Sequence, residues 1–396
     1  MLAEAQEGRN DAGAAVDRVA VTRLMLADFR NYRAARLTLG TEPVVLTGPN
    51  GSGKTNLLEA VSFLAPGRGL RAARLSDVDR RQDADDDPSS SRGWAVAATV
   101  RTRRGMLRIG TGRDGTVGER RIVRIDGEPV RGQAQLSERL GVIWLTPSMD
   151  RLFTEGLGGR RRFLDRLVLG FDPAHASRVT AYEQALRERA RLLRDWPADA
   201  SWLVALEEVM AEQGVAIAAG RRETVRQLDT ACADAEGPFP RARLSVIGAL
   251  ENWLDVIPAL AAETRFAAEL AANRQNDAQA GGAILGPHRS DLRVRLVEKG
   301  TAAELASTGE QKALLISILL AHARLQQATR GEPPLLLFDE IAAHLDANRR
   351  AALFDALRRF DSQVWLTGTD AALFAPMRGE AQFLSVRDGN VTTAFS

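Results

Sequence analysis

The sequence predicts an α/β fold in which one head domain is interrupted by an all-helical insert. Three observations support this prediction. A glycine-rich loop lies between the apolar run 44–46 and a helical pattern that continues to Leu64, and a second apolar run, 335–338, ends in two acidic residues. Between these regions, the stretch 160–280 has a helical pattern that prolines and glycines break repeatedly. Apolar strands that lead into glycine-rich loops and helices are typical of nucleotide-binding α/β proteins.

The first lobe of the head is expected to span residues 18–154, after a disordered extension over residues 1–17 that lacks periodicity. Alternating apolar residues from Val19 onward indicate three strands, the last of which ends at Leu46. A polar, Ser/Asp-rich surface loop is expected at 83–92. Further strands are expected at 94–101, 106–110, 120–125 and 142–145, with Asp126-Gly127 as a hairpin turn.

The remaining chain is expected to form a helical arm, 155–282, and a second head lobe, 283–396. In the arm, no heptad pattern survives for many turns, so a long coiled coil is not expected. The second lobe is expected to contain strands at 292–297, 335–338 and 363–367, helices at 309–328 and 347–360, and a final hairpin ending near Phe395.

The glycine-rich loop has the phosphate-binding pattern G-x-x-x-x-G-K-[ST]. It consists of Gly48, Pro49, Asn50, Gly51, Ser52, Gly53, Lys54 and Thr55. Glycines allow the backbone N–H groups to point at phosphates, Lys54 reaches the β and γ oxygens, and the Thr55 hydroxyl binds Mg²⁺. The chain has 53 basic residues, of which only Lys54, Lys299 and Lys312 are lysines. Since the chain otherwise uses arginine, the lysine at position 54 indicates a need for a compact ammonium, which fits between phosphate oxygens where a planar guanidinium does not.

The apolar run 335–338 and the acids that follow it have the form of a Walker B element. Asp339, at the carboxyl end of the strand, is expected to hold Mg²⁺. Glu340 is expected to accept a proton from the water that attacks the γ-phosphate. Lys54, Asp339 and Glu340 are therefore the predicted catalytic residues, with ATP and Mg²⁺ as the ligands.

The segment Ser307-Thr308-Gly309-Glu310-Gln311, which precedes a helix, looks like the signature of an ABC-type ATPase. A serine hydroxyl and a glycine amide at a helix N-terminus face an anion favourably. By itself, Ser-Thr-Gly-Glu is also a capping box, and the functional interpretation depends on the order of loop, signature and Walker B. In the ABC superfamily this motif contacts the γ-phosphate held by a second subunit, so an ATP-dependent homodimer is expected.

With these motifs the chain resembles the RecF family of DNA replication and repair ATPases, which have an ABC, SMC-like P-loop NTPase head. Four further segments carry the resemblance, namely 28–32 (D-F-R-N-Y), 67–71 (G-R-G-L-R), 160–165 (R-R-R-F-L-D) and 286–292 (G-P-H-R-S-D-L). The resemblance implies an ATP-dependent DNA-binding dimer. It would bind single-stranded and duplex DNA and act at the junctions of single-strand gaps. It further implies work with RecO and RecR, loading of RecA, and a role in the SOS response.

The resemblance also implies roles for individual residues. Arg30 and Asn31 would border the adenine, and Asp346 would lie in the loop that crosses the dimer interface. Thr367 stands where transporters have a switch histidine; it can hydrogen-bond a γ-phosphate but cannot change charge, which fits a weak ATPase. The family's usual Pro-Glu-Asp is replaced by 147–150 (P-S-M-D), so the residue in the Q-loop role is left open.

Charge is distributed unevenly along the chain. The whole sequence has a formal net charge of +2, whereas residues 18–154 contain 23 basic and 15 acidic side chains, a net of +8. This excess predicts an anionic partner larger than a nucleotide. A phosphate-contacting surface is expected if the arginines of the antiparallel strands face the same way, namely Arg101, Arg103, Arg104, Arg120, Arg121 and Arg124.

Alternative functions remain at this stage. An ABC-type ATPase subunit coupled to another partner, such as a transporter, normally has a shorter helical insert. An SMC protein needs a much longer coiled coil, and an inactive scaffold would not retain both Lys54 and Glu340. Since the sequence has no long apolar stretch and no secretory signal, no membrane contact and a cytoplasmic location are expected.

Overall fold

The computed structural model describes residues 18–80, 93–116, 118–130, 133–194, 200–233 and 237–394. The expectations for residues 1–17, for the loop 83–92 and for Phe395 therefore lie outside the described residues. In the described ranges, no helix is both long and apolar enough to cross a membrane.

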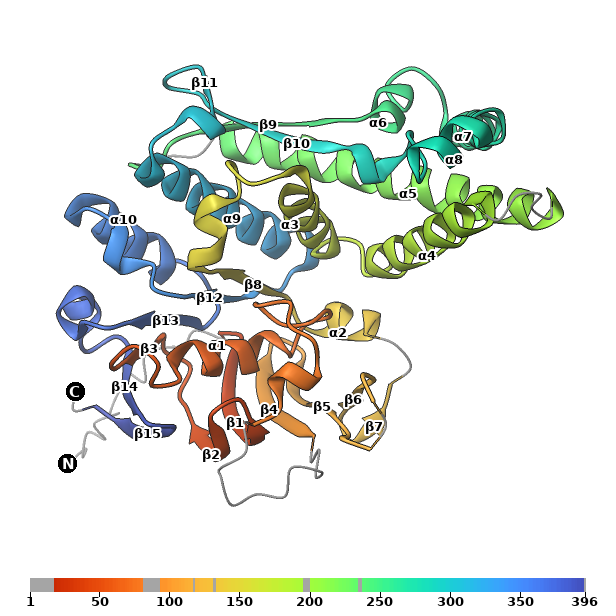
Figure 1. The fold of residues 1–396 in the computed structure, drawn as a ribbon. Helices are drawn as coiled ribbons and strands as arrows, with labels where there is room; N and C mark the ends of the chain where they lie inside the picture. The colour runs from red at the N-terminus through yellow and green to blue at the C-terminus, as the bar shows by residue number, and fades with distance from the viewer. Residues whose placement is uncertain are drawn as a thin grey trace, which may run out of the picture.

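A mostly parallel sheet forms the centre of the molecule (Figure 1). Its strands, in the order in which they pair, are β15 (Asn390–Thr393), β14 (Gln382–Arg387), β3 (Val44–Thr47), β13 (Val364–Gly368), β12 (Leu335–Phe338) and β8 (Val142–Leu145). Only β15 is antiparallel to its neighbour. Every residue of β3, β12 and β13 is buried, as expected for parallel strands covered on both faces. The carboxyl ends of these three strands therefore meet at one edge.

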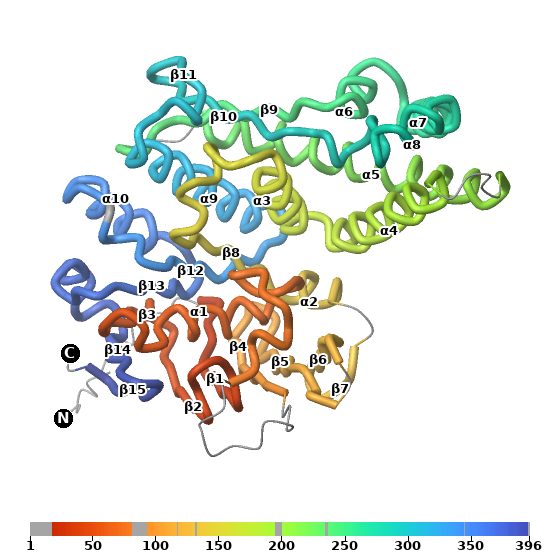
Figure 2. The backbone as a smooth tube through the Cα atoms, viewed as in Figure 1, coloured from red at the N-terminus to blue at the C-terminus, as the bar shows by residue number. Residues whose placement is uncertain are grey.

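An antiparallel sheet lies beside the central sheet, at the end of the molecule away from the arm (Figures 1 and 2). Its strands, in pairing order, are β2 (Tyr32–Thr38), β1 (Ala20–Phe29), β4 (Trp94–Thr102), β5 (Gly105–Arg113), β6 (Arg121–Ile125) and β7 (Glu128–Pro129). Residues alternate between buried and accessible along β4 because only one face of this sheet covers the core. The buried face packs with helix α1 (Lys54–Ser62), where Phe29, Phe63 and Trp94 form a cluster of edge and tilted ring contacts.

The other helices are distributed between the head and the arm (Figure 1). The head contains α2 (Ala134–Arg139), α9 (Thr308–Arg330) and α10 (Ala347–Arg358), and the arm contains α3 (Leu157–Leu169), α4 (His175–Arg194), α5 (Ala200–Ala233), α6 (Ala249–Trp253), α7 (Ala259–Ala272) and α8 (Arg274–Ala280). The 3₁₀ turns are η1 (Ser76–Val78), η2 (Pro147–Arg151), η3 (Pro287–Arg289), η4 (Ala303–Leu305), η5 (Ala342–His344) and η6 (Ala371–Met377). The tube trace in Figure 2 shows the arm extending from the central sheet on the side opposite to the antiparallel sheet.

The expectation of an entirely helical arm is wrong at one segment. Residues 242–247 form a strand, β9 (Ala242–Ile247), which pairs with β10 (Asp291–Leu296), and β10 pairs with β11 (Thr301–Ala302). Ala242 and Leu244 are buried, whereas Arg243 and Ser245 are exposed, so the segment has a period of two. The alternation covers too few residues to be recognised among helical segments. The decisive partner, β10, is distant in sequence, so local pattern alone could not indicate the pairing.

The segment 286–292, which leads into β10, is bonded to side chains of the arm. Gly286 has φ +140, and a side chain there would lie 2.2 Å from the Tyr182 hydroxyl oxygen. That hydroxyl is 2.7 Å from Nδ1 of His288, whose Nε2 is 2.8 Å from the carbonyl oxygen of Ala283. Burial lowers the pKa of His288, consistent with a neutral ring in a structural network.

Two arginines of the arm anchor the same segment. Arg221 donates to the carbonyl oxygen of Pro287 at 2.6 Å and makes two hydrogen bonds to Asp165. Arg160 donates to both oxygens of Asp291, at 2.7 and 3.2 Å, in a largely buried pair. Paired forks of this kind fix orientation as well as charge, so they hold the segment 286–292 and the start of β10 against α3 and α5.

The arm has an ionic core around Arg189, which is 1% exposed. Its guanidinium donates to Glu207 at 2.9 Å, to Asp277 at 2.7 Å and to the carbonyl oxygen of Leu270 at 2.6 Å. Arg274 also pairs with Glu207. The network joins α4, α5, α7 and α8.

Replacing Arg189 with Met is expected to reduce the free energy of unfolding by about 3–5 kcal/mol, because two buried carboxylates lose their main counter-charge. Urea denaturation measures this loss. The matched control is Arg187→Gln on the same helix, where the side chain is 68% exposed and makes only a surface ion pair. Equal stability of the two variants would contradict the structural role of Arg189.

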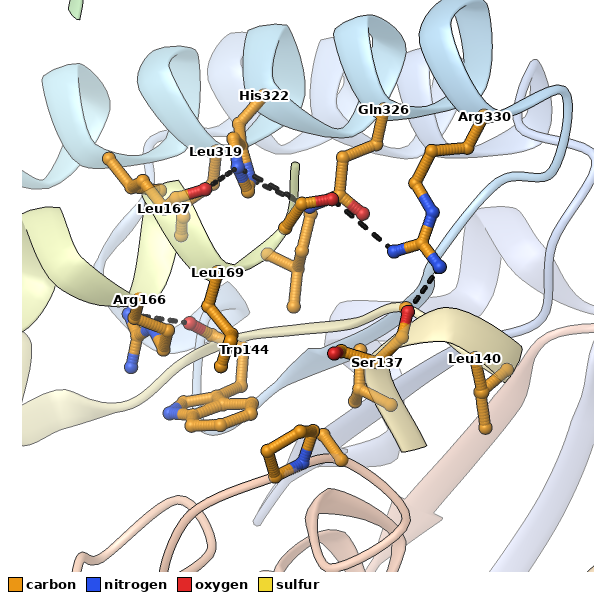
Figure 3. Close-up of a pocket in the computed structure, with 16 residues that line it drawn as sticks. Ser137, Leu140, Trp144, Arg166, Leu167, Leu169, Leu319, His322, Gln326 and Arg330 are labelled. Carbon is orange, nitrogen blue, oxygen red and sulfur yellow. Dashed lines mark hydrogen bonds between the residues drawn. The ribbon is translucent and has the colours of Figure 1, made fainter. Parts of the chain in front are cut away.

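The contact between α9 and the rest of the head contains a buried histidine. His322 lies next to a small cavity of about 50 Å³ between α9, α3, α2 and β8, with Gln326 and Arg330 one and two turns further along α9 (Figure 3). Its Nε2 is 2.8 Å from the carbonyl oxygen of Leu167. Burial lowers the pKa of His322 to about 4. The cavity has room for only one or two water molecules.

Stability is expected to fall as the pH decreases from about 6.5 to 4, because the unfolded chain takes up a proton on His322 that the folded chain excludes. Because the pKa of His322 is about 4 in the folded protein and 6.5 without burial, this histidine contributes up to about 3 kcal/mol to the decrease in the free energy of unfolding at acidic pH. In His322→Gln this contribution is absent, so urea unfolding from pH 7 to pH 4.5 should show a smaller decrease than in the wild type. The same decrease in both proteins would refute the assignment.

Candidate nucleotide site

The site is built around Asp339, where the ends of three strands meet. The Thr55 hydroxyl donates toward its carboxylate, 2.9 and 3.1 Å from the two oxygens, and the Thr367 hydroxyl donates to Oδ1 at 2.8 Å. Thr55 follows β3 through the phosphate loop, Thr367 lies on β13 and Asp339 follows β12. Because β13 lies between β3 and β12 in the sheet, residues 284 positions apart become hydrogen-bonded neighbours.

The phosphate loop depends on backbone conformations that glycine allows. Gly48, Gly51 and Gly53 have φ values of +151, +79 and +114. A side chain at position 48 would lie 2.1 Å from the carbonyl oxygen of Val386, and one at position 53 would lie 2.6 Å from the Tyr32 hydroxyl. The backbone conformation and the close neighbours of the loop therefore require glycine at positions 48 and 53.

Lys54 bridges the loop and the acidic strand end. Its ammonium donates to the carbonyl oxygens of Gly48 at 2.8 Å and Pro49 at 3.0 Å, and lies 3.5 Å from Oε1 of Glu340. Only 4% of the Lys54 side chain is exposed. Glu340 has φ +50, a left-handed conformation that is costly for a residue with a side chain. Its backbone N–H donates to the Thr367 hydroxyl at 2.8 Å, which holds this conformation.

The turn at residues 28–32 clamps the phosphate loop from outside. The Tyr32 hydroxyl donates to the carbonyl oxygen of Gly53 at 3.0 Å, and Asn31 donates to that of Ser52 at 3.1 Å. Arg30 makes a two-pronged contact with the fully buried carboxylate of Glu59 on α1, at 2.7 and 2.8 Å. The guanidinium of Arg30 is thus directed at α1, whereas the polar groups of Asn31 and Tyr32 lie against the loop.

The residues at the site fit ATP and Mg²⁺. The side-chain oxygen of Ser52 is buried and has no hydrogen-bond partner among the described residues, so this polar atom is available to a ligand. The region of Gly51 is open, with nothing within 4 Å of a side-chain position there. Mg²⁺ is commonly held by one carboxylate together with a hydroxyl, phosphate oxygens and water, and Asp339 and Thr55 supply the protein part of such a set. In the described ranges no group of three or more His, Cys, Asp or Glu residues offers a purely protein-made metal site.

The signature segment begins helix α9. Ser307 is the N-cap, and it forms the expected capping box with Glu310. The carboxylate of Glu310 also lies 2.6 Å from Lys299, and these hydrogen bonds to Lys299 and Ser307 lower the pKa of Glu310 to about 2. Within the described residues, no hydrogen bond or ion pair joins 307–309 to the phosphate loop. Capping and ligand contact are compatible, because the N–H group of Gly309 lies at the helix start.

Asp346 lies beside the signature. It is the N-cap of α10, accepting from the N–H of Arg349 at 2.9 Å, and its side chain is 58% exposed. The guanidinium of Arg349 lies 4.0 Å from a side-chain position at Gly309. Just before the signature, Leu305 is 81% exposed. The two predicted interface motifs therefore share one accessible region with an exposed apolar residue.

The loop after β8 contains hydroxyl and carboxylate groups in place of the family's Pro-Glu-Asp. The hydroxyls of Thr146 and Ser148 lie 2.9 Å apart, and the N–H of Asp339 donates to the carbonyl oxygen of Leu145 at the end of β8. Asp150 lies 3.5 Å from Lys312 on α9, and its Oδ1 has no partner among the described residues. Sequence reasoning missed this link, for which the rarity of lysine at position 312 was the available signal.

The six arginines expected to form one surface do not face the same way. Arg121 points into the head: it donates to the carbonyl oxygens of Phe63, Ala65 and Gly67, and burial lowers its pKa to about 9. Arg103 contacts Asp361 and the carbonyl oxygen of Gly331. Arg124 is exposed, one position off the buried face of β6. The expectation is therefore wrong for the cluster as a whole.

Comparisons with known proteins agree with this geometry. The model of the RecF/RecN/SMC N terminal domain matches residues 20–392. The chain is 50% identical over 375 residues to the DNA replication and repair protein RecF of Mesorhizobium japonicum, covering 94% of this chain and 97% of that protein.

Two solved structures show the same fold. One is the recombination mediator protein RecF-ATP in the RecFOR pathway, with a TM-score of 0.82 at 20% identity, covering 97% of this chain and 100% of that chain. The other is an Smc head bound to the C-winged helix domain of ScpA, with a TM-score of 0.52 at 16% identity, covering 95% and 97%.

The expected fold class, an ABC-type ATPase head with a helical insert, is confirmed by these structures. The alternative of a transporter ATPase subunit finds no support among these relatives. Heads of this type belong to a family of ATP-binding ABC-type ATPases. On the family model and the extent of identity, this chain belongs to the RecF family of DNA replication and repair proteins.

Proposed function

We propose that this protein is an ATP-switched DNA-binding protein of replication and gap repair, which forms a homodimer around ATP. One observation carries the proposal. Lys54, Thr55, Asp339 and Glu340 converge on one site, whereas the signature residues Ser307 and Gly309 form no bond to that site within the described chain. A second copy supplies the missing γ-phosphate contacts.

Each residue has a separate task in this scheme. The phosphate-loop amides and Lys54 bind the triphosphate, and Lys54 exchanges its contacts with Gly48 and Pro49 for phosphate oxygens. Thr55 and Asp339 would hold Mg²⁺, which would supply positive charge beside the β- and γ-phosphates. Glu340 orients the attacking water and accepts its proton. The signature of the second copy and its interface-crossing loop, which contains Asp346, close over the nucleotide. The exposed Leu305 becomes buried in the interface.

Thr367 acts on the two acids rather than on the nucleotide. Its hydroxyl has one proton, which is donated to Asp339, and the same oxygen accepts the N–H of Glu340. The residue is fully buried. Thr367 is thus a positioning residue for Glu340, in place of the γ-phosphate contact expected from the sequence, and slow hydrolysis follows from the absence of a charged switch residue at this position.

The biological setting is inferred from the relatives. Proteins named RecF act in DNA replication and repair, and the ATP-bound relative belongs to the RecFOR pathway. We therefore expect cytoplasmic action with RecO and RecR at gapped DNA, weak ATP hydrolysis stimulated by DNA, and an indirect contribution to RecA loading and the SOS response.

Glu340→Gln is expected to trap an ATP-bound dimer, since the water is no longer activated while the phosphate contacts remain. Lys54→Ala is expected to prevent dimerisation, since ATP is no longer held. Light scattering with and without ATP measures both effects. A stable dimer in the absence of nucleotide would contradict the scheme.

Thr367→Val is expected to reduce kcat by roughly 10- to 100-fold, since a hydrogen bond to a charged group is worth about 1.5–3 kcal/mol. ATP affinity should stay within about twofold, and the ATP dimer should live longer. Thr367→Ser is the matched control and should restore kcat, because it keeps the hydroxyl. A parallel loss of ATP affinity would show instead that Thr367 contacts the nucleotide.

A further inference from the structure

The outer face of the antiparallel sheet, the face turned away from the buried core, is strongly basic. In strands β1, β2, β4, β5 and β6 the only acidic residue is Asp28, which pairs with Arg80 at 3.2 Å. The opposite face is apolar and buried, with Leu26, Val96, Ile109 and Val123 in the core. Because side chains alternate along each strand, the exposed arginines of these strands share the outer face.

The strand register places these arginines in two neighbouring rows. Arg36 of β2, Met25 of β1, Ala97 of β4, Gly110 of β5 and Arg124 of β6 form one row across the sheet. The next row contains Arg23, Thr99 and Arg108. With strands about 4.8 Å apart, Arg36 and Arg124 are about 19 Å apart at the backbone, and the two rows are about 7 Å apart.

The surface is hollowed in the middle of this face because residues there have small side chains or none. Ala97 and Gly110 line two adjoining hollows, of about 290 and 530 Å³. Arg124 borders both, and Arg23 and Arg108 border the smaller one. Arg23, Arg36, Arg108 and Arg124 therefore surround a shallow floor, and this set with Ala97 and Gly110 is called the basic trough below.

The charges of the basic trough are not neutralised by the described part of the protein. No acidic residue there forms an ion pair with Arg23, Arg108 or Arg124. Arg124 also donates to the carbonyl oxygen of Gly127 at 3.1 Å. The carboxylates at the far end of the larger hollow are engaged, Asp28 with Arg80 and Asp114 with Thr116. Exposed guanidinium groups around a floor of Ala97 and Gly110, on which Met25 is the one longer apolar side chain of that row, suit a convex polyanion.

We propose that the basic trough binds the phosphate backbone of duplex DNA, without reading its sequence. Duplex DNA carries about one charge per 1.7 Å of axis with both strands counted, so a stretch of about 19 Å contains roughly eleven phosphates, of which those on one side face the trough. Of the residues that line the two hollows, only Trp94, in the larger one, is aromatic. Trp94 is only 3% exposed and its Nε1 donates to the carbonyl oxygen of Leu75, so it offers no exposed ring on which an unpaired base could stack, as sites for single strands require.

This inference rests on the proposed function, because it locates the DNA contact of the ATP-switched protein. It replaces the six-arginine surface expected from the sequence. Arg124 belongs to both the expected surface and the basic trough. Arg121 and Arg103 do not belong to the trough, because they make contacts within the head. The trough also contains Arg23, Arg36 and Arg108, which the sequence did not indicate.

The test compares the full-length triple variant Arg23→Gln, Arg108→Gln and Arg124→Gln with a control of equal charge, Arg324→Gln, Arg359→Gln and Arg378→Gln. The control arginines are exposed and lie in the second half of the chain. Binding to a fluorescent 30-base-pair duplex is measured with ATP from 50 to 200 mM salt. The trough variant should bind at least about tenfold more weakly, and its slope of log K against log salt should be shallower by about 2.7, which is 0.9 for each of three phosphates.

Three outcomes overturn the inference. The trough variant could bind duplex with the affinity and salt slope of the control. It could lose single-stranded but not duplex binding, or poly-glutamate could compete as well as duplex does, which would indicate an acidic protein as the occupant. ATP binding and ATP-dependent light scattering should be unchanged in both variants. Failure of the wild type itself to bind any DNA would instead refute the proposed function.

Discussion

The hydrogen bonds that converge on Asp339 are the constraint on which the site depends. The Thr55 and Thr367 hydroxyls both donate to this carboxylate, so the phosphate loop, β13 and the Walker B strand are held in one geometry. The same Thr367 oxygen supports the unfavourable backbone of Glu340. Hydrogen bonds to a charged group are stronger than neutral ones, and burial strengthens them further. Asp339 and Glu340, which we propose hold the metal ion and accept the proton, are thereby positioned before any ligand is bound.

The surroundings of this junction keep the phosphate loop open. The turn at residues 28–32 holds the loop through its carbonyl groups, while Arg30 fixes the turn itself to the buried Glu59 on α1. Contacts to carbonyls leave the loop's N–H groups directed at the ligand, as phosphate recognition requires. Arginine makes the buried ion pairs at Arg160, Arg189 and Arg221. Of the three lysines, Lys54 contacts the phosphate loop and Glu340, Lys299 pairs with Glu310, and Lys312 contacts Asp150. That contact connects the loop after β8 to the signature helix.

The two ends of the molecule have different chemistry. In the arm, a buried ion pair and hydrogen bonds hold the segment 286–292 against α3, α4 and α5. The antiparallel sheet, at the other end, exposes Arg23, Arg108 and Arg124, which form no ion pair with any described acidic residue, beside the small residues Ala97 and Gly110. The proposed nucleotide-dependent dimer would bring two copies of both features into one assembly, so that the uneven charge of the chain would become a property of its surface.

The sequence by itself determined the local elements and the chemistry of the site. The strands at 335–338 and 142–145, the phosphate loop, the Walker B acids and the capping box at Ser307 follow from neighbouring residues, because each depends on local periodicity or on a short motif. Only the tertiary structure decided the pairing of β9 with β10, the burial of Arg121 and the contacts of Thr367 and Arg30 with Asp339 and Glu59. These features join residues far apart in the chain, and whether an arginine or threonine meets water, a carboxylate or a ligand depends on the strand placed beside it.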